Sequence, residues 1–62
     1  MDAKTRKLIE DKIVEYSEKA KQRNWQAEAE TNKTKRAHYM AANVVYTIVV
    51  SDLQILLLDA EV

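Results

Sequence analysis

Hydrophobic side chains are concentrated in the second half of this chain. Residues 37–58, AHYMAANVVYTIVVSDLQILLL, hold most of the large apolar residues and no Lys or Arg, whereas residues 1–36 are rich in charge. The chain contains no Gly and no Pro, the two residues that most often interrupt helices. The pattern predicts two long helices, at about residues 3–30 and 35–60, and therefore an all-α fold.

A turn is predicted between these helices, at residues 31–34. Thr31, Asn32 and Thr34 form the one cluster of side chains that readily bond their own backbone. Asn32 tolerates the left-handed conformation that often follows a helix, and Thr31 or Thr34 is expected to cap the second helix. Asp2 is expected to cap the first. The two arms then form an antiparallel two-helix hairpin, a single domain of 62 residues.

The first helix is expected to present only a thin apolar stripe, with residues at steps of three and four. Beyond Ala20 the stripe is mainly alanine, so this part should approach a neighbouring helix closely and bury little surface. Charge pairs four residues apart stabilise the exposed surface by roughly a few tenths of a kcal/mol each. The stripe is Ile9, Ile13, Tyr16, Ala20 and Ala27, with Arg23 in its one gap, and the pairs are Arg6–Glu10, Lys7–Asp11 and Glu15–Lys19.

The second helix has two apolar sectors when its residues are placed about 100° apart. One thin stripe cannot cover both. The broad sector holds Tyr39, Ala42, Val45, Tyr46, Val49, Val50, Leu53, Leu56 and Leu57. The narrow sector holds Ala37, Val44, Ile48 and Ile55, and the larger of two polar wedges between the sectors holds Asn43, Thr47, Ser51 and Gln54.

A turn at residues 31–34 aligns residues whose numbers sum to about 64. This register predicts that the narrow sector contacts the first helix and that opposite charges meet near the chain ends. The predicted pairs are Ile9 with Ile55, Tyr16 with Ile48, Ala20 with Val44 and Ala27 with Ala37, and Lys4, Arg6 and Lys7 come near Asp59 and Glu61.

The broad sector then remains uncovered, and a contiguous exposed apolar surface usually marks a protein interface. A chain of 62 residues is only marginally stabilised by its own core, and without cysteine it has no disulfide to help. We therefore predict a homodimer in which two hairpins form a four-helix bundle. The predicted self-association interface is Val45, Val49, Leu53 and Leu56.

A strand is the alternative for residues 44–50, VVYTIVV, because β-branched and aromatic residues favour strands. Periodicity alone cannot assign an apolar run this short. No turn signal follows the run and no second strand is present to pair with it, which favours the helix.

Charge is divided between the two halves although the formal net charge is zero. Residues 1–36 carry all ten Lys and Arg beside seven acids, whereas residues 37–62 carry three acids and no Lys or Arg. The neutral balance argues against a protein dedicated to nucleic acid, which is usually basic. No apolar run follows the first positive charges, so we expect no signal peptide and a cytoplasmic location.

The residue types of a hydrolase triad are present but badly spaced. His38 precedes Ser51 and Asp52 by more than three turns of the same predicted helix, so the histidine cannot take the serine proton. Acids such as Glu28 and Glu30 do not share a helix face. We therefore predict no enzyme, no metal site and no cofactor.

The favoured function is non-enzymatic protein–protein interaction, by a small helical adaptor or inhibitor that occupies a partner's surface. The alternative is a small nucleic-acid-associated regulator, in which a basic elbow contacts phosphates and a tryptophan stacks on a base. Membrane insertion is disfavoured because a central Asp52 costs about 3 kcal/mol in lipid. The residues proposed for partner or nucleic-acid contact are Arg23, Trp25, Lys33, Lys35 and Arg36.

Overall fold

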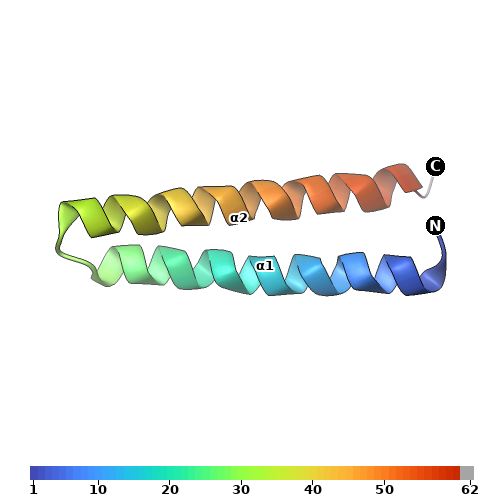
Figure 1. Ribbon diagram of the computed structural model, residues 1–62, viewed down its shortest axis with the longest axis horizontal. Helices are drawn as coiled ribbons and strands as arrows, with labels where there is room; N and C mark the ends of the chain where they lie inside the picture. Colours follow the sequence, from blue (N-terminus) through green and yellow to red (C-terminus); the bar gives the residue numbers. More distant parts are fainter. Residues whose placement is uncertain (61–62) are drawn as a thin grey trace.

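The computed structural model describes residues 1–60, which form two α-helices joined by a short turn (Figure 1). Helix α1 spans Ala3–Ala29 and helix α2 spans Lys33–Ala60. The helices run antiparallel along a rod with extents of 46 × 16 × 11 Å. The predicted helical hairpin is confirmed, and residues 44–50 belong to α2 rather than to a strand.

Helix α1 begins where the sequence predicts. The carboxylate of Asp2 accepts a hydrogen bond of 2.7 Å from the backbone N–H of Thr5. This bond lowers the pKa of Asp2, because it stabilises the charged form of the carboxyl group. The predicted cap is therefore confirmed. Two of the predicted ion pairs of α1 are also present, Arg6–Glu10 at 3.0 Å and Lys7–Asp11 at 3.3 Å.

The turn is shorter than predicted and is built differently. Glu30, Thr31 and Asn32 separate the helices, and Asn32 caps α2 through its Oδ1, which accepts a 3.1 Å bond from the N–H of Lys35. The left-handed conformation anticipated for Asn32 is absent, since no residue in the described range has a positive φ. Instead, Nε and Nη2 of Arg36 donate to the carbonyl oxygen of Glu30, at 3.0 and 2.8 Å. These bonds satisfy the carbonyl oxygen of the residue that caps the end of α1.

Replacing Asn32 with alanine is expected to lower the free energy of unfolding by about 1 kcal/mol, because an N–H in the first turn of α2 loses its acceptor. Denaturant unfolding followed by circular dichroism measures this change. Asn32→Asp keeps an acceptor and should stay close to the parent protein, as should Thr31→Ala next to it. An equal loss in Thr31→Ala would contradict the capping role of Asn32.

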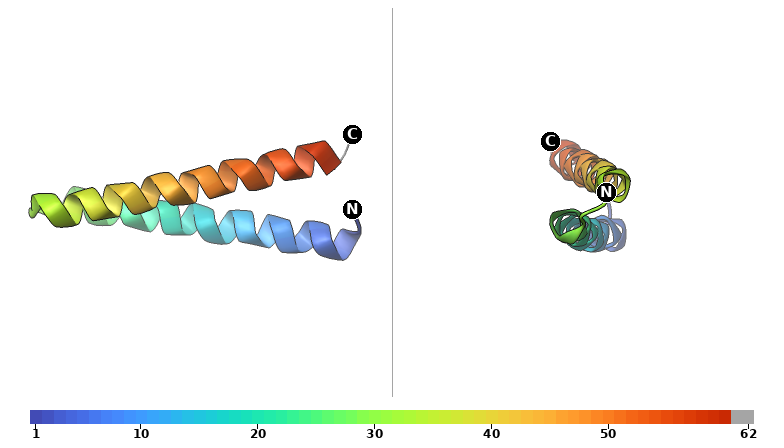
Figure 2. Two further views of the ribbon diagram at one scale, coloured as in Figure 1. Left: turned by 45° about the horizontal axis from the view of Figure 1, so that its top comes forward. Right: turned by 90° about the vertical axis from the view of Figure 1, so that its left-hand side faces the viewer.

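The two helices approach most closely near the turn and diverge toward the chain termini (Figure 2). Ala27 is the one buried residue of the described range, with an exposed fraction of 2%. Further along, Nδ2 of Asn43 donates to the carbonyl oxygen of Ala20 at 2.7 Å, in a partly buried hydrogen bond between the helices. The close approach predicted for the alanine-rich part of α1 is confirmed, and the asparagine sets the register there.

A pair of tyrosines forms the middle of the contact between the helices. The rings of Tyr16 and Tyr46 stack with centroids 5.8 Å apart and planes inclined by 20°. Nζ of Lys19 lies 5.1 Å from the ring centroid of Tyr16 and 5.9 Å from that of Tyr46. The predicted pair of Glu15 with Lys19 is therefore wrong. Lys19 lies over the two rings, where cation–π attraction holds it, and Glu15 accepts a 3.1 Å bond from Lys12 instead.

The broad sector of α2 contacts α1, so the predicted contact through the narrow sector is wrong. Tyr16 meets Tyr46 rather than Ile48, and Ile48 and Ile55 are each 54% exposed. The predicted register errs by only one or two residues. The broad sector carries Tyr46, whose ring stacks on that of Tyr16. The half-buried residues of α2 are Tyr39, Ala42, Asn43, Tyr46, Val49, Val50, Leu53 and Leu57.

The charge contacts predicted near the chain ends involve the acids Asp59 and Glu61. Glu61 lies outside the described residues, whereas Asp59 is exposed in the last turn of α2.

Candidate interaction surface

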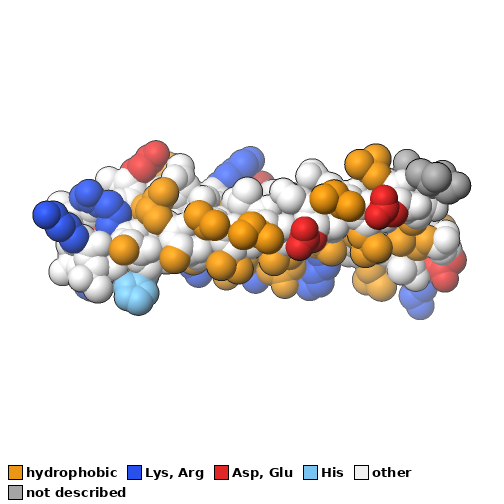
Figure 3. Space-filling model, turned by 90° about the horizontal axis from the view of Figure 1, so that it is seen from above, with side chains coloured by type: hydrophobic (Ala, Val, Ile, Leu, Met, Phe, Trp, Pro, Cys, Tyr) orange, Lys and Arg blue, Asp and Glu red, His pale blue; other side chains and the backbone are white. Residues whose placement is uncertain are grey.

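The side of α2 that faces away from α1 is apolar and exposed. Figure 3 looks onto α2 and shows hydrophobic side chains along the length of the helix. Their exposed fractions range from 43% at Met40 to 64% at Leu58. Single exposed hydrophobic residues are normal on proteins, but a continuous stripe of them marks an interface. We call this stripe the outer face of α2 and define it as Ala37, Met40, Ala41, Val44, Ile48, Ser51, Ile55 and Leu58.

The four residues of the predicted self-association interface lie in two different environments in the structure. Val45 and Leu56 are 56% and 47% exposed and border the outer face. Val49 and Leu53 are half-buried, on the side of α2 that carries Tyr46 and contacts α1. Two of the four predicted residues are therefore available to a partner, and the other two already pack within the hairpin.

The predicted basic elbow does not form one surface. Trp25 is 76% exposed, and residues two apart on a helix project about 200° apart, so Arg23 lies on the opposite side of α1. Nη1 of Arg23 donates to Gln26 at 2.6 Å. The guanidinium of Arg36 is engaged by the carbonyl of Glu30. The structure therefore brings neither arginine to the tryptophan.

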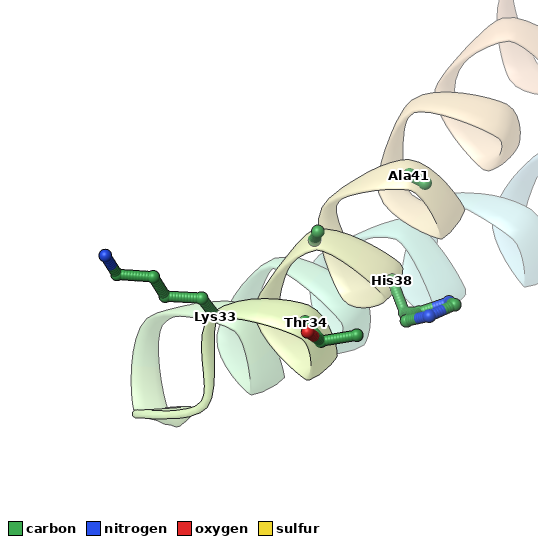
Figure 4. Close-up of a pocket in the computed structure, with 5 residues that line it drawn as sticks. Lys33, Thr34, His38 and Ala41 are labelled. Atoms are coloured by element: carbon green, nitrogen blue, oxygen red, sulfur yellow. The ribbon is translucent and has the colours of Figure 1, made fainter.

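A shallow depression lies at the start of α2, where Lys33, Thr34 and His38 surround Ala37 and Ala41. Lys33 extends away from His38 in the close-up of this region (Figure 4). Lys33 and Lys35 are both exposed. Because the polar groups do not converge, the depression offers no set of donors that would fix a small ligand.

Catalytic and metal chemistry receive no support from the side-chain arrangement. His38 and Ser51 are thirteen residues apart on one helix, a separation of about 20 Å along the axis. Across residues 1–60, no group of three or more His, Cys, Asp or Glu is placed to hold a metal ion.

Helix α2 is long and apolar enough to cross a membrane by length and composition alone. Its most apolar 18-residue window has a mean hydropathy of 1.7, and none of that window is buried. The core helix of a soluble protein meets the same length and composition test. The length and composition of α2 therefore fit either setting.

Comparisons with protein-family models, with curated proteins and with solved structures found no match to this chain.

Proposed function

We propose that this protein is a non-enzymatic protein–protein interaction module, and that its binding surface is the outer face of α2. The observation that carries the proposal is the exposure of Val44, Ile48 and Ile55, each more than half exposed on a helix whose other side already packs on α1. Fully burying such a side chain contributes about 1.5–3 kcal/mol, and roughly half of that is still to be gained at each of these positions. A partner that covers this face would therefore gain favourable free energy from apolar burial.

The accessible surface of the hairpin supports this proposal. The chain exposes 4872 Å², whereas a compact monomer of 7.2 kDa exposes about 4100 Å². The excess of roughly 750 Å² is close to the area that each partner buries in a standard protein–protein interface, about 800 Å². A hairpin with one buried residue in its described range gains the missing apolar burial by binding a partner.

The chemistry of the outer face favours protein over nucleic acid. The face is apolar, and the charged residues beside it in the second half of α2 are the acids Asp52 and Asp59. A phosphate backbone would be repelled by these acids and would find no cation among the outer-face residues. An apolar helix surface suits another helix, which an adaptor or inhibitor of this kind would bind or block.

Photo-cross-linking inside the producing cell tests the proposal. A photoreactive amino acid replaces Ile48 on the outer face, and a matched control replaces Asp11, which is exposed on α1. We expect a discrete protein adduct from position 48 and none from position 11. Adducts with lipid alone, or no adduct from position 48, would overturn the proposed function.

A further inference from the structure

We propose that the outer face of α2 binds the outer face of a second copy of this chain, with the two α2 helices antiparallel. This inference rests on the proposed function and names the partner. Its basis is the spacing of the outer face, in which positions 37, 41, 44, 48, 51, 55 and 58 alternate at steps of four and three. This is the heptad spacing of a coiled-coil seam, whose residues interlock with a facing helix.

The same helix already uses heptad spacing on its other side. The half-buried positions 39, 42, 46, 49 and 53 alternate at steps of three and four on the side that contacts α1. The two seams lie on opposite sides of α2. A second copy on the outer face therefore places the two α2 helices at the centre, with one α1 on each outside.

The sizes of the side chains at these seven outer-face positions favour the antiparallel orientation of the two α2 helices. The seam has small residues, Ala37 and Ala41, near the turn and large residues, Ile55 and Leu58, near the other end. Parallel helices would pair small with small at one end and large with large at the other, so their separation would change along the contact. In an antiparallel pair both ends of the contact match the small Ala37 with the large Ile55, so the two ends have the same separation.

Charge selects the same orientation. Lys33, Lys35 and Arg36 occupy the first turn of α2, while Asp52 and Asp59 lie in its second half. Figure 3 shows basic side chains at the end near the turn and acidic side chains on the front of α2 toward the other end, with an acidic side chain also near the turn and further basic side chains along the edges. A parallel pair would bring like charges together at both ends, whereas an antiparallel pair places each basic end beside an acidic one.

One register satisfies the seam over almost the full length of the helix. When facing residue numbers sum to 92, Val44 faces Ile48 of the second copy and Ala37 faces Ile55 of the second copy. Shifting by one heptad either way shortens the overlap of the two helices.

Disulfide cross-linking between single-cysteine variants tests the orientation. Because the chain has no native cysteine, every disulfide that forms involves the introduced positions. Ala37→Cys and Ile55→Cys are made in chains with tags of different mass, mixed, refolded together and oxidised. Both positions are exposed, so the helices should form in each variant, as circular dichroism checks. We expect the mixed dimer to dominate over both like-with-like dimers.

The alternative orientations give distinct products. Positions 37 and 55 are about 27 Å apart along the helix, so a parallel pair would cross-link like with like and exclude the mixed product. Like-with-like products, or a variant mixture that stays monomeric, would overturn the inference. If photo-cross-linking at position 48 captures a different protein, the proposed function stands and the second copy is the wrong partner.

Discussion

Ile48→Asp is expected to dissociate the proposed dimer and to lower the helix content of the hairpin. Ile48 lies at the middle of the outer face and, in the antiparallel register, packs against Val44 of the second copy. Ile48 is 54% exposed in the hairpin, so the apolar burial lost from the two copies is worth about 1.5–3 kcal/mol together, and two carboxylates must also be buried. The lost burial alone weakens dimerisation about 10- to 10²-fold and the buried carboxylates weaken it further, which sedimentation at graded concentrations measures.

Val14→Asp is the matched control for that substitution. Val14 is 63% exposed on α1, so the variant makes the same kind of change, a β-branched residue to aspartate inside a helix, away from the outer face. The control should remain dimeric. Loss of the dimer in Val14→Asp, or a dimeric Ile48→Asp, would show that the outer face of α2 is not the interface.

Ala27→Leu is expected to destabilise the hairpin by about 1–3 kcal/mol. Ala27 is 2% exposed at the point where the two helices are closest, so a larger side chain forces them apart. The hydrogen bond between Asn43 and the Ala20 carbonyl lies nearby along the same contact and is expected to weaken as well. Thermal unfolding followed by circular dichroism gives the loss as a lower melting temperature.

Ala29→Leu serves as the control for this overpacking. Ala29 is exposed two residues further along α1, and leucine and alanine have similar helix propensities. Its stability should therefore change little. If Ala27→Leu were as stable as Ala29→Leu, the helices could not be in tight contact at residue 27.

The helices and the hairpin could be predicted because the local sequence signals of this chain all favour the same secondary structure. The lack of Gly and Pro, the cap at Asp2 and the polar cluster around Asn32 all place the same two helices and the same turn. Even the β-branched run at 44–50 did not change the outcome, since it had no strand to pair with. The structure of the turn was harder to predict, because it depends on a hydrogen bond from the side chain of Arg36 to the carbonyl oxygen of Glu30, six residues earlier.

The face of α2 that contacts α1 could not be predicted from the angular positions of its residues around the helix axis alone. Both apolar sectors offer heptad spacing, and only the stacked pair of Tyr16 and Tyr46 and the bond from Asn43 to Ala20 distinguish them. The signal for the second seam was nevertheless present in the sequence. The alternation of fours and threes from Ala37 to Leu58 continues through Ser51, a polar residue that hides the pattern from a count of apolar positions.

The molar mass of the native chain in solution tests the central claim most directly. Light scattering on a sizing column at several concentrations, with and without lipid vesicles, is the measurement. A second copy on the outer face predicts twice the chain mass of 7.2 kDa, falling toward one chain only on dilution, and no binding to vesicles. A helical species of one chain mass at every concentration, or a chain recovered with the vesicles, would contradict the account.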